Sequence, residues 1–143
     1  MNSNKENPSV GKKFQSLTAE LLSKHFDKDF ISEIAINIGN PLKAHKFDLV
    51  SKDNSVVVEC KCYTWTEGQN NPSAKMATLN EAVLYFKLLP DSWKKVIAMK
   101  KSVHPRRSKT LADYYKRRYE FVLDGITIIE IDVDTQTVKI IKE

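Results

Sequence analysis

The stretch Val56–Lys61, Val-Val-Val-Glu-Cys-Lys, constrains the fold of this chain more than any other. Three consecutive β-branched residues favour a buried strand. An acid and a base follow in the same strand, at Glu59 and Lys61. Because side chains alternate along a strand, these two project from one face, where their burial is costly unless a partner compensates the charge. The stretch therefore predicts a sheet protein with a charged site next to its core.

Apolar periodicity and turn residues predict helices and strands on both sides of this strand. A polar tail is expected over 1–9. The expected elements are a helix from Val10 to about Phe26, strands over 30–38, 46–50 and 56–63, a helix from Asn71-Pro72 to before Pro90, a strand over 96–99, a helix from Ser108 toward Leu123, and strands over 126–131 and 137–141. This order, α-β-β-β-α-β-α-β-β, predicts an α/β fold with a mixed sheet in a single domain over 10–143.

Composition limits the class of protein. The 143 residues suit one domain, and 41% hydrophobic with 29% charged residues is ordinary for a globular protein. No membrane span, signal peptide or nucleotide-binding loop is present, so we expect a cytoplasmic protein without a nucleotide cofactor. Cys60 and Cys62 give no disulfide framework and lack a second pair of zinc ligands. They are expected to be small buried hydrophobes.

Positive charge is concentrated in one part of the chain. The net charge is +5, and residues 93–120 hold ten basic residues against two acidic ones. Such a patch is typical of a protein that binds a polyanion, because neutralising phosphates releases counterions, although a solvated helix face is the alternative. Lys75 is added because it begins a helix beside the strand of Lys61. The residues expected to contact nucleic acid are Lys75, Lys100, Lys101, Arg106, Arg107, Lys109, Arg117 and Arg118.

Asp48 lies on the preceding strand, eleven residues before Glu59. With a turn at Asp53-Asn54, Asp48 comes opposite or one residue diagonal to Glu59. Two carboxylates supply the hard oxygen ligands that magnesium prefers, together with waters and a substrate phosphate, and a neighbouring lysine can orient the attacking water. This set predicts a phosphodiester-hydrolysis site. A salt bridge of Lys61 with Asp48 or Glu59 on an exposed sheet face is the alternative.

Asp48, Glu59-Cys60-Lys61 and the preceding helix with Glu20 resemble the PD-(D/E)xK nuclease superfamily, which has a restriction-endonuclease-like core. The shared order α-β-β-β-α-β covers residues 10 to about 100, and 110–132 resembles Mrr-like members. The resemblance implies that Asp48 and Glu59 hold the metal, that Lys61 positions the nucleophile, and that Glu20 is an additional acid. An ordinary surface position is the alternative for Glu20.

This chain departs from the superfamily motif at one position. Phe47 precedes Asp48, in place of the proline that gives the motif its name. The implied cofactor is Mg²⁺, with Mn²⁺ accepted by the same oxygen ligands. The implied partner is DNA, and pairing of small members to cut two strands is compatible with a homodimer.

We therefore expect a magnesium-dependent nuclease that hydrolyses DNA phosphodiester bonds, as an endonuclease rather than an exonuclease. Two other classes stay open. The chain would be a non-catalytic nucleic-acid-binding module if it bound DNA in a salt-sensitive way without cleaving it. It would be a protein-interaction subunit of a larger defence or repair complex if it had no affinity for DNA at low salt.

Overall fold

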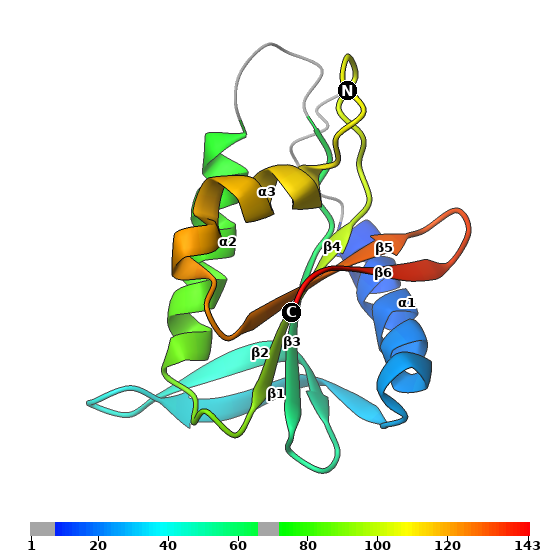
Figure 1. Ribbon diagram of the computed structural model, residues 1–143. Coiled ribbons are helices and arrows are strands. Elements are labelled where there is room, and N and C mark those ends of the chain that lie inside the picture. The colour runs from blue at the N-terminus through cyan, green and yellow to red at the C-terminus, as the bar shows by residue number, and fades with distance from the viewer. Residues whose placement is uncertain (1–7, 66–71) are drawn as a thin grey trace.

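The computed structural model describes residues 8–65 and 72–143 (Figure 1). Within these residues, six strands form one sheet in the order β1-β2-β3-β4-β5-β6. The strands are β1 (Phe30–Ile38), β2 (Lys43–Ser51), β3 (Val56–Lys61), β4 (Lys94–Lys100), β5 (Ile126–Asp132) and β6 (Thr137–Lys142). The helices are α1 (Pro8–Phe26), α2 (Ser73–Lys87) and α3 (Leu111–Tyr119), with a short 3-10 turn, η1 (Glu120–Val122), after α3. The predicted α/β fold with a mixed sheet is confirmed.

The sheet combines antiparallel and parallel pairing. β1, β2 and β3 form an antiparallel meander, and β5 and β6 an antiparallel hairpin. β3 is parallel to β4, and β4 to β5. Parallel neighbours need crossover connections, and α2 and α3 provide them on one face of the sheet, while α1 covers the other (Figure 1). The carboxyl ends of β3, β4 and β5 therefore lie at the same end of the sheet.

Each face of the sheet has its own apolar core. On one face, Val57 and Ile97 pack beneath α2 and α3. On the other face, Val58 and Val96 pack against Leu22 of α1. These four strand residues are fully buried because helices cover both sides of β3 and β4. Cys60 and Cys62 are half-buried, rather than buried as expected, and they pack against the α1-side core.

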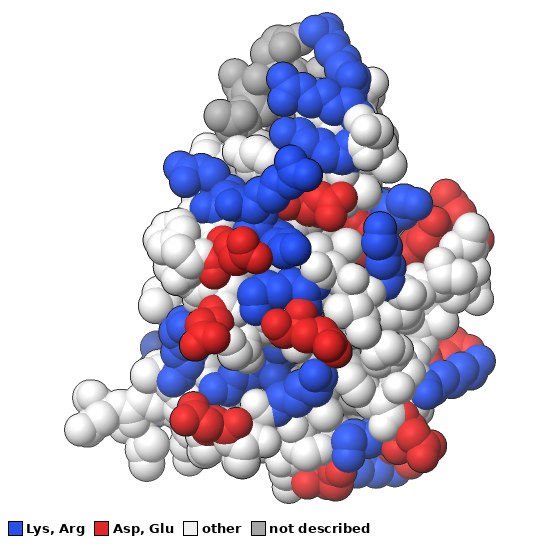
Figure 2. All heavy atoms as spheres, in the orientation of Figure 1, with Lys and Arg blue, Asp and Glu red and all other residues white. Residues whose placement is uncertain are grey.

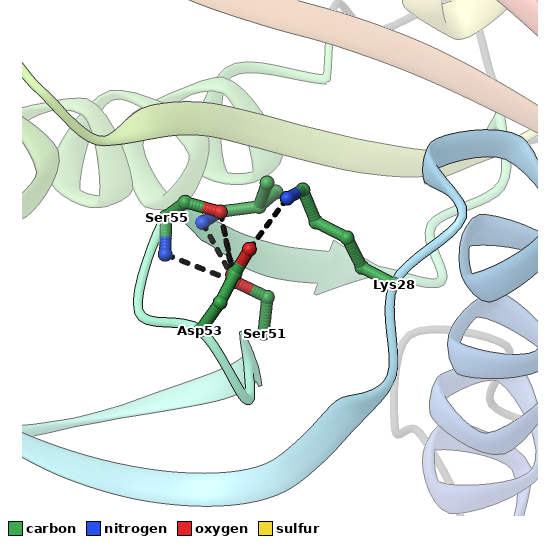
Figure 3. Close-up of polar contacts among 5 residues, drawn as sticks. Lys28, Ser51, Asp53 and Ser55 are labelled. Atoms are coloured by element: carbon green, nitrogen blue, oxygen red, sulfur yellow. Dashed lines mark hydrogen bonds and ion pairs between the residues drawn. The ribbon is translucent and has the colours of Figure 1, made fainter.

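The turn between β2 and β3 is held by a compact set of hydrogen bonds (Figure 3). The Ser51 Oγ accepts the backbone N–H groups of Ser55 at 3.0 Å and Val56 at 2.9 Å. The Asp53 carboxylate accepts the hydroxyls of Ser51 and Ser55 and pairs with the Lys28 ammonium. In a hairpin the turn sets the pairing of the strands, so this turn decides which residues of β2 and β3 face each other.

The structure corrects two expected helix boundaries. α1 begins at Pro8, so residues 8 and 9 belong to the helix rather than to the expected tail, because proline is suited to a first helical turn. α3 is capped by Thr110, whose Oγ1 accepts the Asp113 N–H at 3.2 Å, and not by Ser108. The expected cap at Asn71 lies outside the described residues, as does the tail over 1–7. No described helix is long and apolar enough to cross a membrane.

Candidate active site

Asp48 occupies a break in the regular pairing of β2. The ladder pairs Ser32 with Leu49 and Ile34 with Phe47, but the position between them, where Glu33 would face Asp48, carries no pair. The backbone of Glu33 has a positive φ of 56°, which is uncommon for a residue other than glycine. Phe47 packs in the α2/α3 core and Leu49 in the α1 core, although they are two residues apart. The alternation of β2 side chains between the two faces of the sheet is therefore shifted by one residue at Asp48.

The Asp48 side chain bonds to β3, the neighbouring strand on the other side of β2. Its Oδ2 accepts the backbone N–H of Cys60 at 2.8 Å. Val50 pairs with Val57, and both belong to the α2/α3 core. Asp48 lies two residues before Val50, and Glu59 lies two residues after Val57. Because alternate residues of a strand share a face, both acids are placed on the α2/α3 face. The structure thus brings the two acids together.

Glu59 is almost completely buried, with 7% of its surface exposed. Burial, followed by the neighbouring Asp48 carboxylate, raises the pKa of Glu59 to about 8, while Lys61 opposes the shift. The Oε1 atom of Glu59 has no hydrogen-bond partner among the described residues. A buried carboxyl with a raised pKa beside a second carboxylate is typical of a functional site.

His45 also lies in this cluster, although no sequence pattern pointed to it. Its Nε2 lies 3.7 Å from the Glu59 Oε1, and within the described chain neither atom has a hydrogen-bond partner. The imidazole stacks on the ring of Tyr85 of α2, with the ring centroids 3.9 Å apart. Burial lowers the pKa of His45, despite the opposing charges of Asp48 and Glu81, so the ring is neutral at pH 7.

If side chains alternated strictly along β2, His45 would not be expected near Asp48. It precedes Asp48 by three residues, which in a regular strand places the two side chains on opposite faces. The interrupted pairing at Asp48 shifts the alternation by one residue, so His45 and Asp48 share a face of the sheet and both lie beside Glu59. A single-residue irregularity of this kind leaves no pattern that a periodicity analysis detects.

Lys61 and Glu20 differ in their relation to the acid pair. Lys61 is half-buried at the end of β3, on the face of Glu59, and its charge opposes the rise of the Glu59 pKa. Glu20 is exposed on α1, whose buried residues pack on the opposite face of the sheet. Nothing in the described part of the chain joins Glu20 to Asp48 or Glu59. Three of the four predicted catalytic residues are therefore neighbours, and Glu20 stands apart.

Two carboxylates suit magnesium, which binds through one or two of them and keeps waters and substrate phosphates as its other ligands. The Oε1 of buried Glu59, which has no hydrogen-bond partner in the described part of the chain, lies beside the Asp48 carboxylate and fits that donor set. Across residues 8–65 and 72–143, no group of three or more His, Cys, Asp or Glu residues is arranged to hold a metal. A zinc centre with four protein ligands is therefore not formed by these residues.

The predicted nucleic-acid-binding residues fall into separate places. Lys100 ends β4 but alternates onto the α1 face, and Lys101 pairs with Asp132 at 3.6 Å. Lys75 is half-buried and donates to the Thr64 carbonyl. The other five are Arg106, Arg107 and Lys109 in the segment between β4 and α3, and Arg117 and Arg118 on α3. Figure 2 shows Lys and Arg side chains gathered at the upper end of the molecule, over that segment and α3, with acidic residues interspersed below.

Comparison with known proteins gives a likeness of fold. No family model matches the sequence, and no curated protein matches it significantly. A solved structure, a CdiA-CT/CdiI toxin and immunity complex from Burkholderia pseudomallei, contains a similar chain, with a TM-score of 0.54 and 14% sequence identity. The match covers 99% of this chain and 96% of that chain. At this identity the likeness concerns the fold alone, and it extends over the whole chain.

Proposed function

We propose that this protein is a metal-dependent nuclease that hydrolyses DNA phosphodiester bonds at Asp48, Glu59 and Lys61. The acid pair carries this proposal: Glu59 is 7% exposed, has an oxygen without a hydrogen-bond partner among the described residues and lies beside the half-buried Asp48 carboxylate, which the Cys60 N–H holds in place. A buried carboxylate beside a second one is costly unless a cation compensates the charge. The resemblance of these residues to the PD-(D/E)xK motif gives independent support.

The residues of the site have complementary roles in the proposed reaction. Asp48 and Glu59 would hold magnesium, which when bound neutralises charge that develops on the phosphate. Lys61 donates to the attacking water and orients it toward phosphorus. The water oxygen forms the new bond to phosphorus and gives up one proton to solvent, the bond to the leaving oxygen breaks, and the leaving oxygen takes up a proton from solvent. Lys61 also offers positive charge to the phosphate oxygens as this charge develops.

A second candidate function comes from the structural neighbour. Because the likeness to a chain of a toxin and immunity complex spans 99% of this protein, we also consider membership of such a pair, with a protein as its partner. This candidate and the nuclease are compatible if this chain is the active member. Co-purification with a dedicated partner, together with loss of DNA cleavage in the complex, would support both.

Cleavage assays test the nuclease directly. Supercoiled plasmid and labelled single-stranded, branched and RNA substrates would be incubated with magnesium, with manganese and with chelator. We expect metal-dependent cutting by the wild type and by Lys52→Ala, an exposed lysine in the β2–β3 turn that serves as the matched control. Lys61→Ala should abolish cutting. Activity that survives in Lys61→Ala would place the reaction elsewhere, and salt-sensitive binding without any cleavage would leave a binding module.

A further inference from the structure

The segment between β4 and α3 forms a tight hairpin, residues 101–110, which we call the basic hairpin. The His104 N–H donates to the Lys109 carbonyl at 2.8 Å, and the Arg107 N–H to the His104 carbonyl at 3.4 Å. At the tip, the Arg106 N–H donates to the His104 Nδ1 at 3.0 Å. Partial burial and the surrounding cations lower the pKa of His104, so its ring is neutral at pH 7 and able to accept this bond. The hairpin is therefore held in shape by its own hydrogen bonds.

Trp65 ties the basic hairpin to the strand of the candidate active site. It follows Lys61 by four residues, and its backbone N–H donates to the Ser102 Oγ at 2.9 Å. Its indole packs edge-on against His104, with centroids 4.8 Å apart, and against Tyr114 of α3, at 5.2 Å. The segment that leaves β3, the hairpin and the first turn of α3 thus form one packed unit.

The cations of this unit either pack on the aromatic group or stand exposed at the tip of the hairpin. The Lys109 Nζ lies 4.9 Å from the Tyr114 ring centroid and 5.7 Å from that of Trp65. Arg106 and Arg107 are exposed at the tip. The hairpin contains no acidic residue. It follows β4, which is parallel to β3, so its cations stand at the end of the sheet where Lys61 lies.

We propose that the basic hairpin clamps the phosphate backbone of a nucleic acid, and that Trp65 is the positioning residue that locks the clamp to the strand carrying Lys61. This inference rests on the proposed function, which places a phosphodiester chain at that end of the sheet. Exposed arginines match phosphate geometry, and backbone contacts position a substrate without reading its sequence. His104, Tyr114 and Lys109 surround the indole, which is half-buried against the core, so Trp65 serves packing rather than base stacking.

Binding in chelator tests the clamp independently of cleavage. The affinity of a fluorescent DNA duplex would be measured by anisotropy over a range of salt concentrations. Arg106→Ala/Arg107→Ala should make the plot of log affinity against log salt shallower by about two, because each phosphate contact contributes about 0.9 to the slope. The matched control is Lys12→Ala/Lys13→Ala, which removes two exposed cations from α1. An equal change in the control would overturn the clamp, since net charge alone would then explain it.

The role of Trp65 is tested by variants that remove no charge. We expect Trp65→Ala to weaken duplex binding about tenfold and to flatten the salt slope, whereas Trp65→Phe keeps most of both. If Trp65→Ala does not fold, Ser102→Ala removes the hydrogen-bond acceptor and should flatten the slope by a smaller amount. A folded Trp65→Ala with the wild-type slope would overturn the positioning role.

A competition experiment identifies the ligand class. Polyglutamate matched in charge to the DNA should displace it poorly, because the clamp is fitted to phosphates. Equal displacement would overturn the assignment to nucleic acid and indicate an acidic protein.

The proposed clamp and the proposed nuclease activity can be refuted independently of each other. Hairpin-dependent binding without cleavage leaves the clamp and refutes the nuclease. Cleavage that depends on Lys61 but not on the hairpin refutes the clamp.

Discussion

The carboxyl of Glu59 is buried beside a second carboxylate, and both conditions favour its protonated form. Its pKa of about 8 lies well above the ordinary value of 4.5. The imidazole of His45, 3.7 Å from the Glu59 Oε1, makes no hydrogen bond to it. A divalent cation held by Glu59 and Asp48 would reverse the preference, because it stabilises the charged form.

We expect the stability of the metal-free protein to fall as the pH rises from about 4.5 to about 8, because the folded state keeps the Glu59 proton that the unfolded chain releases. The loss should be on the order of 1–4 kcal/mol. Glu59→Gln cannot release a proton and should remove this decline. Urea unfolding in chelator at about pH 5 and about pH 9 checks the prediction. Wild type and variant declining in parallel would contradict it.

Magnesium should stabilise the folded protein through Asp48 and Glu59. At about ten times its Kd, a ligand that binds only the folded state adds about 1.4 kcal/mol. We expect a rise in Tm of a few degrees in the wild type and in Lys52→Ala, and none in Asp48→Asn. Thermal melts with and without magnesium measure it. The same rise in Asp48→Asn would place the cation at another site.

Two local features decide which residues meet at the site: the turn between β2 and β3, and the interrupted pairing of β2 at Asp48. The turn over 51–55 sets the pairing of β2 with β3, so the approach of Asp48 to Glu59 and Lys61 was predictable from turn residues and alternation. The break at Asp48 was not, because it coincides with a positive φ at Glu33 in a neighbouring strand, which no sequence pattern indicates. His45 reaches the site only through that break.

The β2–β3 turn should lose stability when Asp53 is replaced by Asn. Hydrogen bonds from Lys28, and then from Ser55 and Ser51, hold the pKa of Asp53 well below its ordinary value of 3.8. Their stabilisation is complete above that ordinary value and is lost as the pH falls below it. The Tm of Asp53→Asn should therefore lie a few degrees below wild type at about pH 7, with a smaller gap at about pH 3. Asp91→Asn, at an exposed site, is the control, and a gap that did not narrow would contradict the prediction.

The whole molecule is built from two cores that share one sheet. Much of this architecture was predictable, because the apolar periods of α1, α2 and the strands are clear in the sequence. The cap of α3 was not, since Ser108 and Thr110 are both suitable N-cap residues. Pairing of Val103 with Thr110 closes the hairpin before the helix and so selects Thr110.

Because the cores share their strands, we expect them to unfold together. Leu22→Ala in the α1-side core and Phe86→Ala in the α2/α3 core should each cost roughly 2–5 kcal/mol. Trp65 and Trp93 both pack against the α2/α3 core, so fluorescence reports that side, whereas circular dichroism reports all helices. Both probes should give one midpoint in Leu22→Ala. A fluorescence midpoint unchanged from wild type in that variant would show that the cores unfold separately.

The basic hairpin is closed at its base, where Val103 pairs with Thr110 and the Leu111 N–H donates to the Ser102 carbonyl at 2.9 Å. The residues at its tip can therefore be exchanged without altering the strands of the sheet. Under the proposed function, substitutions over 105–108 would change the affinity for nucleic acid while Asp48, Glu59 and Lys61 stay in place. Designed variants of this chain would in this way differ in affinity through changes in one short turn.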